Sequence, residues 1–135
     1  MGAADRATAE AIIGASCRLT FWLSDEAQMH AVTAVSGSGS AYVFYLMHAL
    51  QQAAQGLGFG ADEARALSLQ TFRGAVELAA QSGADFATLQ DAVTSKGGTT
   101  FAALETFRQR AVAEHLREGV NAAAARSVEL GRDLG

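Results

Sequence analysis

The chain has 135 residues, half of them apolar, and carries a formal net charge of −4. This length fits a single domain, and the apolar content excludes a disordered chain. The negative charge excludes a nucleic-acid-binding function, which would require a basic surface. A single cysteine, Cys17, excludes an internal disulfide bond and favours a cytoplasmic location.

No run of residues is long and apolar enough to predict a membrane span, and the first ten residues do not resemble a signal peptide. Residues 1–4 look like an appended start rather than a lipidation signal. The apolar neighbours of Cys17 predict a buried thiol. Proline is absent from the chain. Either the domain is almost wholly helical or its prolines were removed deliberately, and the sequence leaves both interpretations open.

The first elements in chain order are a helix over 5–16, ending near Gly14, and a run with a β-like alternation over 17–23. Leu19, Phe21 and Leu23 alternate with Arg18 and Thr20 in that run. It is too short to form a sheet by itself, so we expect an extended segment. A helix over 24–36 follows, with Ser24 or Asp25 as its cap.

Two long helices are predicted next, over 40–58 and 61–83, with glycines at their ends. The first is apolar nearly all round, which predicts a central, buried helix. We expect both helices at a subunit interface, because their many small residues bury little area within one chain. His48, on the first helix, is predicted to be a core residue whose polar atoms are satisfied.

Three further helices are predicted over 84–95, capped by Asp85, over 99–109 and over 110–131. The chain is therefore predicted to be all-α, a bundle of about six to seven helices with one short extended segment near residues 17–23. Self-association would supply the burial that alanine-rich faces lack, so we expect a homodimer.

The stretch "VTSKGGTTFAAL" (93–104) holds the chain's only lysine, Lys96, and a Gly-Gly pair before a predicted helix start. Unpaired amides at a helix start attract anions, and glycine lets a ligand approach the backbone. A carboxylate suits such a loop. The same residues are also typical of an ordinary capped connection between helices, and the loop alone does not decide between the two.

A second glycine-rich stretch, "SGSGSAY" (36–42), has the same pattern, with Ser38 or Ser40 as a cap, and also resembles a flexible linker. It lacks the Gly-Lys-Ser/Thr of a phosphate loop and the strand–turn–helix setting of a dinucleotide fingerprint. The three histidines, His30, His48 and His115, have no neighbouring ligands at metal-binding spacing, so no metal is expected.

The segments "DEAQMHAVTAVSGSGSAYVFYLMHAL" and "LQDAVTSKGGTTFAALETF", in this order, resemble the carboxy-terminal domain of pyrroline-5-carboxylate reductase. The resemblance extends from residue 5 to about residue 131. It implies a helical domain that forms an interleaved homodimer, and it leaves open whether dimers join into a larger ring. Members of this family reduce 1-pyrroline-5-carboxylate to L-proline with NADPH or NADH.

The resemblance also implies the site residues. The Gly98 and Thr99 amides and the Ser95 hydroxyl would hold the substrate carboxylate, and Thr100, the implied catalytic residue, would bind the ring nitrogen. The implied substrate-binding residues are Val93, Ser95, Gly97, Gly98, Thr99 and Thr100, and the implied cofactor-binding residues are Ser38, Gly39, Ser40 and Ala41.

The family's amino-terminal dinucleotide-binding domain is not expected in residues 1–135, so no bound cofactor is expected and the chain is not expected to be active alone. Ser40 stands where the family has proline, and Lys96 and Gly60 stand where the family often has proline. These replacements suggest a proline-depleted, isolated domain. The alternative is a non-catalytic helical dimer scaffold kept for its fold.

Overall fold

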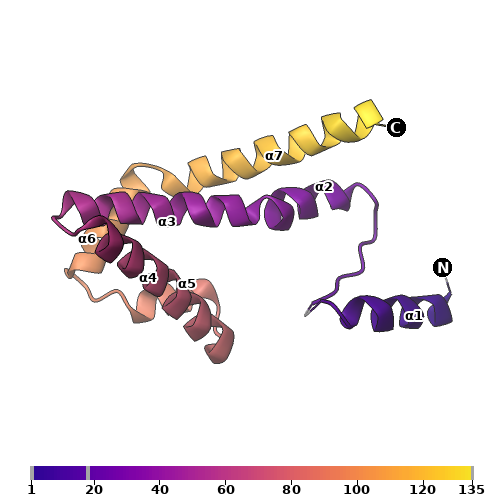
Figure 1. Ribbon diagram of the computed structural model, residues 1–135, viewed down its shortest axis with the longest axis horizontal. Helices are drawn as coiled ribbons and strands as arrows, with labels where there is room; N and C mark the ends of the chain where they lie inside the picture. The colour runs from indigo at the N-terminus through magenta and orange to yellow at the C-terminus, as the bar shows by residue number, and fades with distance from the viewer. Residues whose placement is uncertain (1, 18, 135) are drawn as a thin grey trace.

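The protein is helical throughout its regular structure, as predicted (Figure 1). The structure is a computed structural model that describes residues 2–17 and 19–134, and within those ranges there is no strand. The elements are α1 (Ala3–Gly14), α2 (Gln28–Val32), the π-helical turn η1 (Thr33–Gly37), α3 (Gly39–Gly56), α4 (Ala61–Ser82), α5 (Phe86–Ala92), α6 (Thr99–Gln109) and α7 (Val112–Leu134).

Several helix ends are set by the residues that the sequence indicated. Gly83 ends α4 with a φ of 66°, a left-handed conformation that glycine adopts without steric cost. Asp85 caps α5, because its carboxylate accepts a hydrogen bond from the Thr88 amide at 2.9 Å. At the start of α4, the Glu63 carboxylate accepts one from the Gly60 amide at 3.0 Å.

Elements α2, η1 and α3 follow one another as one long helical rod, and α7 runs beside it (Figure 1). Helix α7 packs against α2 and η1, whereas α4 packs against α3. The buried hydroxyl of Ser68 on α4 donates to the Met47 carbonyl on α3 at 2.7 Å. Ala64, also on α4, is fully buried. Small residues such as Ala64 and Ser68 let α4 lie close to α3.

Helix α1 lies apart from the other helices (Figure 1). The segment that follows it, residues 17 and 19–23, forms neither helix nor strand, as expected for a short extended segment, while Arg18 lies outside the described residues. The prediction that Cys17 is buried is wrong, because its thiol is exposed. Apolar neighbours in sequence did not bury the thiol because α1 and this segment do not pack on the helical body.

The single chain buries very little. Its buried residues are Ala34, Ala64 and Ser68, and its accessible surface is 10662 Å² within the described residues. A compact protein of its mass, 14.0 kDa, would expose about 6,700 Å². The difference reflects helices that are spread out rather than packed around one core.

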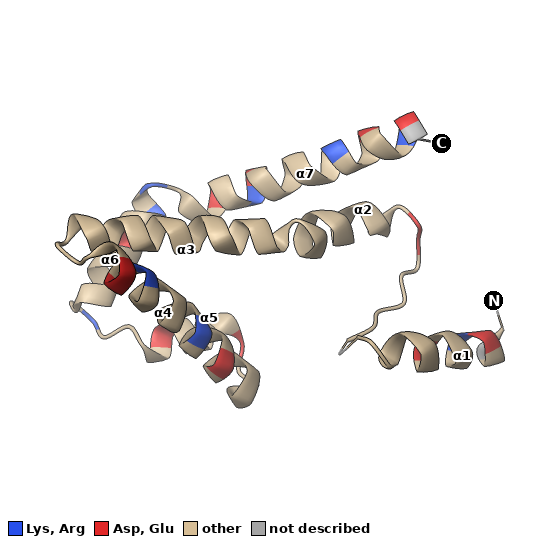
Figure 2. Cartoon of the chain, in the orientation of Figure 1, with Lys and Arg blue, Asp and Glu red and all other residues tan. Residues whose placement is uncertain are grey.

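The rod formed by α2, η1 and α3 shows this most clearly. Residues 27–61 contain no Asp, Glu, Lys or Arg, and the rod is free of charge along its length (Figure 2). Yet Phe44 is 66% exposed and Tyr45 is 75% exposed. The predictions that α3 is buried and that His48 is a core residue are therefore wrong for the single chain, in which His48 is exposed. The apolar faces have no partner within this chain.

Among the described helices, none combines the length and the hydropathy needed to cross a membrane.

Candidate functional site

The loop between α5 and α6 turns sharply at its two glycines. Gly97 has a φ of 75°, which glycine adopts more readily than other residues. The Gly98 amide then donates to the Ser95 carbonyl at 3.0 Å and closes the turn. A β-carbon on Gly98 would lie 2.5 Å from the Ser95 hydroxyl oxygen, so only glycine fits there without a shift. The Gly-Gly pair is thus a requirement of this turn.

Helix α6 begins directly after this turn with free backbone donors. Its first helical bond runs from the Ala102 amide to the Gly98 carbonyl at 3.1 Å. In the part of the chain that the structure describes, the amides of Thr99, Thr100 and Phe101 have no hydrogen-bond acceptor, and no side chain caps the helix. Three donors at the positive end of a helix form an arrangement that suits a small anion.

The predicted substrate-binding residues are contiguous in this loop, and most of their surface is accessible. Val93, Ser95, Gly97, Thr99 and Thr100 are exposed, whereas Gly98 is half-buried. One detail differs from the expectation. The Gly98 amide, expected to hold a carboxylate, already donates within the turn. The donors left for a ligand are therefore the amides that follow it and the exposed hydroxyls of Ser95, Thr99 and Thr100.

The stretch expected on the cofactor side has a different geometry from the loop. Ser38 is the N-cap residue of α3, one of the two predicted positions, but its backbone is in the right-handed helical region and its side chain makes no capping bond. The Ser38 amide donates to the Thr33 carbonyl at 2.8 Å, five residues back, which is the bond of a π-helix. Ser38, Gly39, Ser40 and Ala41 thus lie where a π-helical turn passes into α3, and the stretch is not a flexible linker.

The single chain does not bring the two stretches together. The turn η1 packs against α2, α3 and α7, while α6 packs against α7. Within the described ranges, neither α5 nor α6 packs extensively against η1 or against α3, which holds residues 39–41. A site that used both stretches would therefore need a second copy to supply one of them.

Three residues around η1 had not been singled out from the sequence. The Tyr42 hydroxyl donates to the Ala34 carbonyl at 3.1 Å, and Nδ1 of His30 lies 3.0 Å from the Ser127 hydroxyl oxygen. Tyr42 could have been suspected, because it follows the glycine-rich stretch by two residues. The His30–Ser127 contact joins residues 97 positions apart, and no local sequence pattern indicates it.

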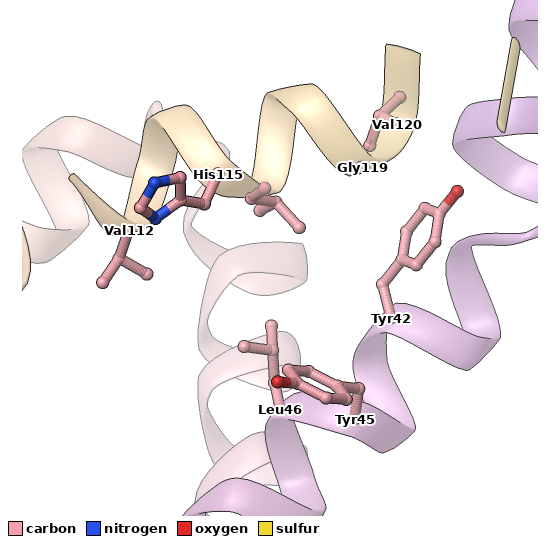
Figure 3. Close-up of a pocket in the computed structure, with 8 residues that line it drawn as sticks. Tyr42, Tyr45, Leu46, Val112, His115, Gly119 and Val120 are labelled. Carbon is pink, nitrogen blue, oxygen red and sulfur yellow. The ribbon is translucent and has the colours of Figure 1, made fainter. Parts of the chain in front are cut away.

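An apolar groove of about 340 Å³ lies between α3 and α7 (Figure 3). Tyr42, Tyr45 and Leu46 line it from α3, and Val112, Leu116 and Val120 are among the residues that line it from α7. The side chains of Tyr42 and Tyr45 diverge along α3. This open, apolar groove continues the uncharged surface of the rod.

Metal-ligating side chains are scattered. No three His, Cys, Asp or Glu side chains gather where they could hold a metal ion among residues 2–17 and 19–134.

These features define a helical assembly domain, with open apolar faces and a loop that leads into a helix start with free backbone donors. The family model for pyrroline-5-carboxylate reductase dimerisation matches residues 26–130. The chain belongs to this family. The match favours a reductase dimerisation domain over the non-catalytic helical scaffold, which was the alternative from the sequence.

Curated relatives agree with the family match. The chain is 45% identical over 117 residues to a pyrroline-5-carboxylate reductase of Pseudomonas aeruginosa, covering 87% of this chain and 43% of the relative. It is 39% identical over 126 residues to that of Haemophilus influenzae, covering 93% and 46%. The chain thus spans less than half the length of these relatives.

Two solved structures share the fold. A pyrroline-5-carboxylate reductase from Coxiella burnetii superposes with a TM-score of 0.89 at 36% identity, over 96% of this chain and 48% of that one. The Plasmodium falciparum enzyme, solved with NADP bound, superposes with a TM-score of 0.83 at 28% identity, over 97% and 49%.

Proposed function

We propose that this chain is the dimerising, substrate-binding part of a cytoplasmic pyrroline-5-carboxylate reductase, which reduces 1-pyrroline-5-carboxylate to L-proline. The observation that carries the proposal is the row of free amides at the start of α6, beside the Gly97–Gly98 turn. The substrate is proposed from the family to which the chain belongs and from the names of the chain's relatives. The cytoplasmic location is proposed from the lone cysteine.

In this proposal the substrate carboxylate binds the amides of Thr99 and Thr100 together with the Ser95 hydroxyl. The Thr100 hydroxyl binds the ring nitrogen, and the Val93 carbonyl lies nearby. The Gly98 amide already donates to the Ser95 carbonyl at 3.0 Å, so it would contribute only by sharing its hydrogen with the ligand. Thr100 is thus the proposed catalytic residue, since it alone would touch the reacting imine.

NADPH or NADH would supply the hydride to the imine carbon. Ser38, Gly39, Ser40 and Ala41 fit an uncharged nicotinamide ring, because residues 27–61 offer no lysine or arginine for a diphosphate. We therefore propose that neither NADPH nor NADH stays bound to this chain on its own, and that the chain has no reductase activity alone. The groups that would hold the diphosphate belong to the part of the relatives that this chain does not span.

We further propose that the homodimer completes the site. The π-helical turn and the α5–α6 loop do not meet within one chain, so residues 38–41 of one copy would face residues 93–100 of the other. Mixed dimers test this arrangement. A spin label on Ser40→Cys in one copy, with Cys17→Ser to remove the native thiol, should broaden the Thr99 and Thr100 amide signals of an isotopically labelled partner copy. Partner signals that stay sharp in the mixed dimer, together with broadening in a chain that carries both labels and is diluted with unlabelled copies, would contradict it.

Titration with L-proline tests the substrate site. Proline should shift the amide signals of Ser95, Gly98, Thr99 and Thr100 with a millimolar Kd, because a carboxylate held by a few neutral hydrogen bonds gains only about 4 kcal/mol. L-Prolinamide, which lacks the carboxylate, is the control and should leave these signals in place. Thr100→Ala should weaken binding without changing helix content. Shifts that scatter over the surface would mean that the loop is only a connection.

A further inference from the structure

The π-helical turn between α2 and α3 is an unusual way to place a glycine-rich stretch. Ser36, Gly37, Ser38 and Gly39 have weak helix propensity, because glycine loses more backbone entropy on ordering and serine competes for backbone hydrogen bonds. A π-helical turn is also rarer than an α-helical one and is frequent at functional sites. Local propensity therefore does not explain why this stretch is ordered, and contacts from elsewhere must hold it.

One contact to the turn comes from Tyr42, in the first turn of α3. In an α-helix the Ser38 amide would donate to the Ala34 carbonyl, four residues back. Here it donates to the Thr33 carbonyl instead, at 2.8 Å. The Tyr42 hydroxyl donates to the Ala34 carbonyl at 3.1 Å. The side chain of Tyr42 thus supplies the Ala34 carbonyl with a donor in place of the Ser38 amide.

The other side of the turn is held by α7. Ala34 is 1% exposed, so η1 packs closely against its neighbours. One turn earlier, Nδ1 of His30 lies 3.0 Å from the Ser127 hydroxyl oxygen on α7. A β-carbon on Gly131 would lie 3.2 Å from Cε1 of His30, so α7 presents a residue without a side chain where the imidazole approaches it. The turn is therefore fixed from α3 by Tyr42 and from α7 through His30.

We propose that Tyr42 is a positioning residue that holds the π-helical turn in register and thereby fixes the orientation of Ser38, Gly39, Ser40 and Ala41. The proposal rests on the nicotinamide-facing role suggested above for those four residues. Tyr42 itself touches no reacting atom. It acts through the Ala34 carbonyl, with the His30–Ser127 contact as the second support of the same turn.

Tyr42→Phe removes the hydroxyl and keeps the ring in the groove between α3 and α7. Tyr45→Phe is the matched control, because Tyr45 lies on the same helix, lines the same groove and is 75% exposed. Amide hydrogen exchange at Ser38 reports on the π-helical bond to Thr33. Loss of one neutral hydrogen bond should raise its exchange rate about five-fold in Tyr42→Phe. The Ala34 carbonyl ¹³C signal should also move, while exchange in α4 and α7 stays as in the wild type.

Ligand binding separates positioning from stability. With reduced nicotinamide mononucleotide as the probe, the wild-type chain and Tyr45→Phe should show equal shifts at residues 38–41, and Tyr42→Phe should bind several-fold more weakly. Ser127→Ala should weaken binding in the same direction, because it releases the turn from α7.

The outcomes are distinct. Unchanged Ser38 exchange and unchanged probe affinity in Tyr42→Phe would overturn the positioning role. A uniform rise in exchange over all helices would overturn it as well, because Tyr42 would then support the whole fold and not the turn. A wild-type chain that leaves residues 38–41 unshifted by the probe would overturn the nicotinamide role proposed for them, and the exchange result would still decide whether Tyr42 holds the turn.

Discussion

Ser95 and Gly98 face each other across one tight turn, with the Ser95 hydroxyl oxygen in the space that a side chain at residue 98 would occupy. A β-carbon there would lie 2.5 Å from that oxygen and 3.2 Å from the Ser95 carbonyl oxygen. The backbone oxygen cannot move without opening the bond that it accepts from the Gly98 amide. The start of α6, and the donors it presents, therefore depend on glycine at this position.

Gly98→Ala should destabilise the chain by about 1–2 kcal/mol, because the new methyl group overpacks the turn. It should also abolish the amide shifts that L-proline causes, because Thr99 and Thr100 move with the turn. Gly56→Ala is the control, since nothing lies within 4 Å of a β-carbon at that position. Thermal unfolding and the proline titration check both effects. If Gly98→Ala bound L-proline as tightly as the wild-type chain does, the Ser95 side chain would simply move aside.

Ala111→Gly should stabilise the protein. Ala111, between α6 and α7, has a φ of 53° and is the one residue other than glycine with a positive φ within the described ranges. Glycine there removes a steric cost of about 1 kcal/mol. Ala103→Gly, inside α6, should instead cost about 1 kcal/mol. Urea unfolding of the two variants measures the difference. An equal loss of unfolding free energy in both variants would mean that the left-handed conformation at Ala111 carries no strain.

Acid should loosen the first turn of α5. The hydrogen bond from the Thr88 amide, followed by that from the Thr88 hydroxyl, lowers the pKa of the Asp85 carboxyl below its usual value. Because the pKa is lower in the folded state, the contribution of Asp85 is complete above the unfolded pKa of about 4 and is lost as pH falls through the folded pKa. The Thr88 amide should therefore exchange faster, relative to other helical amides, in acid below that value. Asp85→Asn should remove this pH dependence, and a dependence that persists in the variant would point to another group.

Assembly should double the mass in solution. The described part of the chain exposes about 4,000 Å² more than a compact protein of its size, or about 8,000 Å² for two copies, which is more than the roughly 2,000–5,000 Å² that obligate dimers commonly bury in total. Light scattering at micromolar concentration should give twice the 14.0 kDa chain mass or a larger even multiple. Phe44→Glu places a charge on the uncharged rod and should shift the mass toward that of one chain. Phe86→Glu, at the first residue of α5, tests a face farther along the chain. A monomer that unfolds cooperatively would contradict this prediction.

The sequence predicted the helices well wherever their ends are set locally. Asp85 as a cap, Gly83 as a stop and Gly98 before α6 each act through a bond or a backbone conformation within a few residues, so composition and spacing suffice to indicate them. The loop at 93–100 was found for the same reason. Its backbone donors follow from the start of a helix.

What the sequence did not predict depends on distant contacts. A Gly-Ser stretch predicts a loop or a cap. Here it forms a π-helical turn, which contacts from Tyr42 and α7 support. The predicted burial of Cys17 and His48 is wrong for the single chain. Apolar neighbours in sequence indicate a segment that avoids water, but they do not indicate whether another part of the same chain packs on it.

The contact between His30 and Ser127 also sets an order of folding. It closes a loop of 97 residues, whereas the bond between Ser68 and Met47 closes one of 21. Closing the longer loop costs about 1.4 kcal/mol more chain entropy. The α3–α4 hairpin should therefore form first and α7 should dock late, so pulse-labelled exchange should protect the Ser68 region before His30. Until α7 arrives, the apolar rod is open to α7 of any other newly made copy, and the exchange of this helix between copies becomes a competing route of folding.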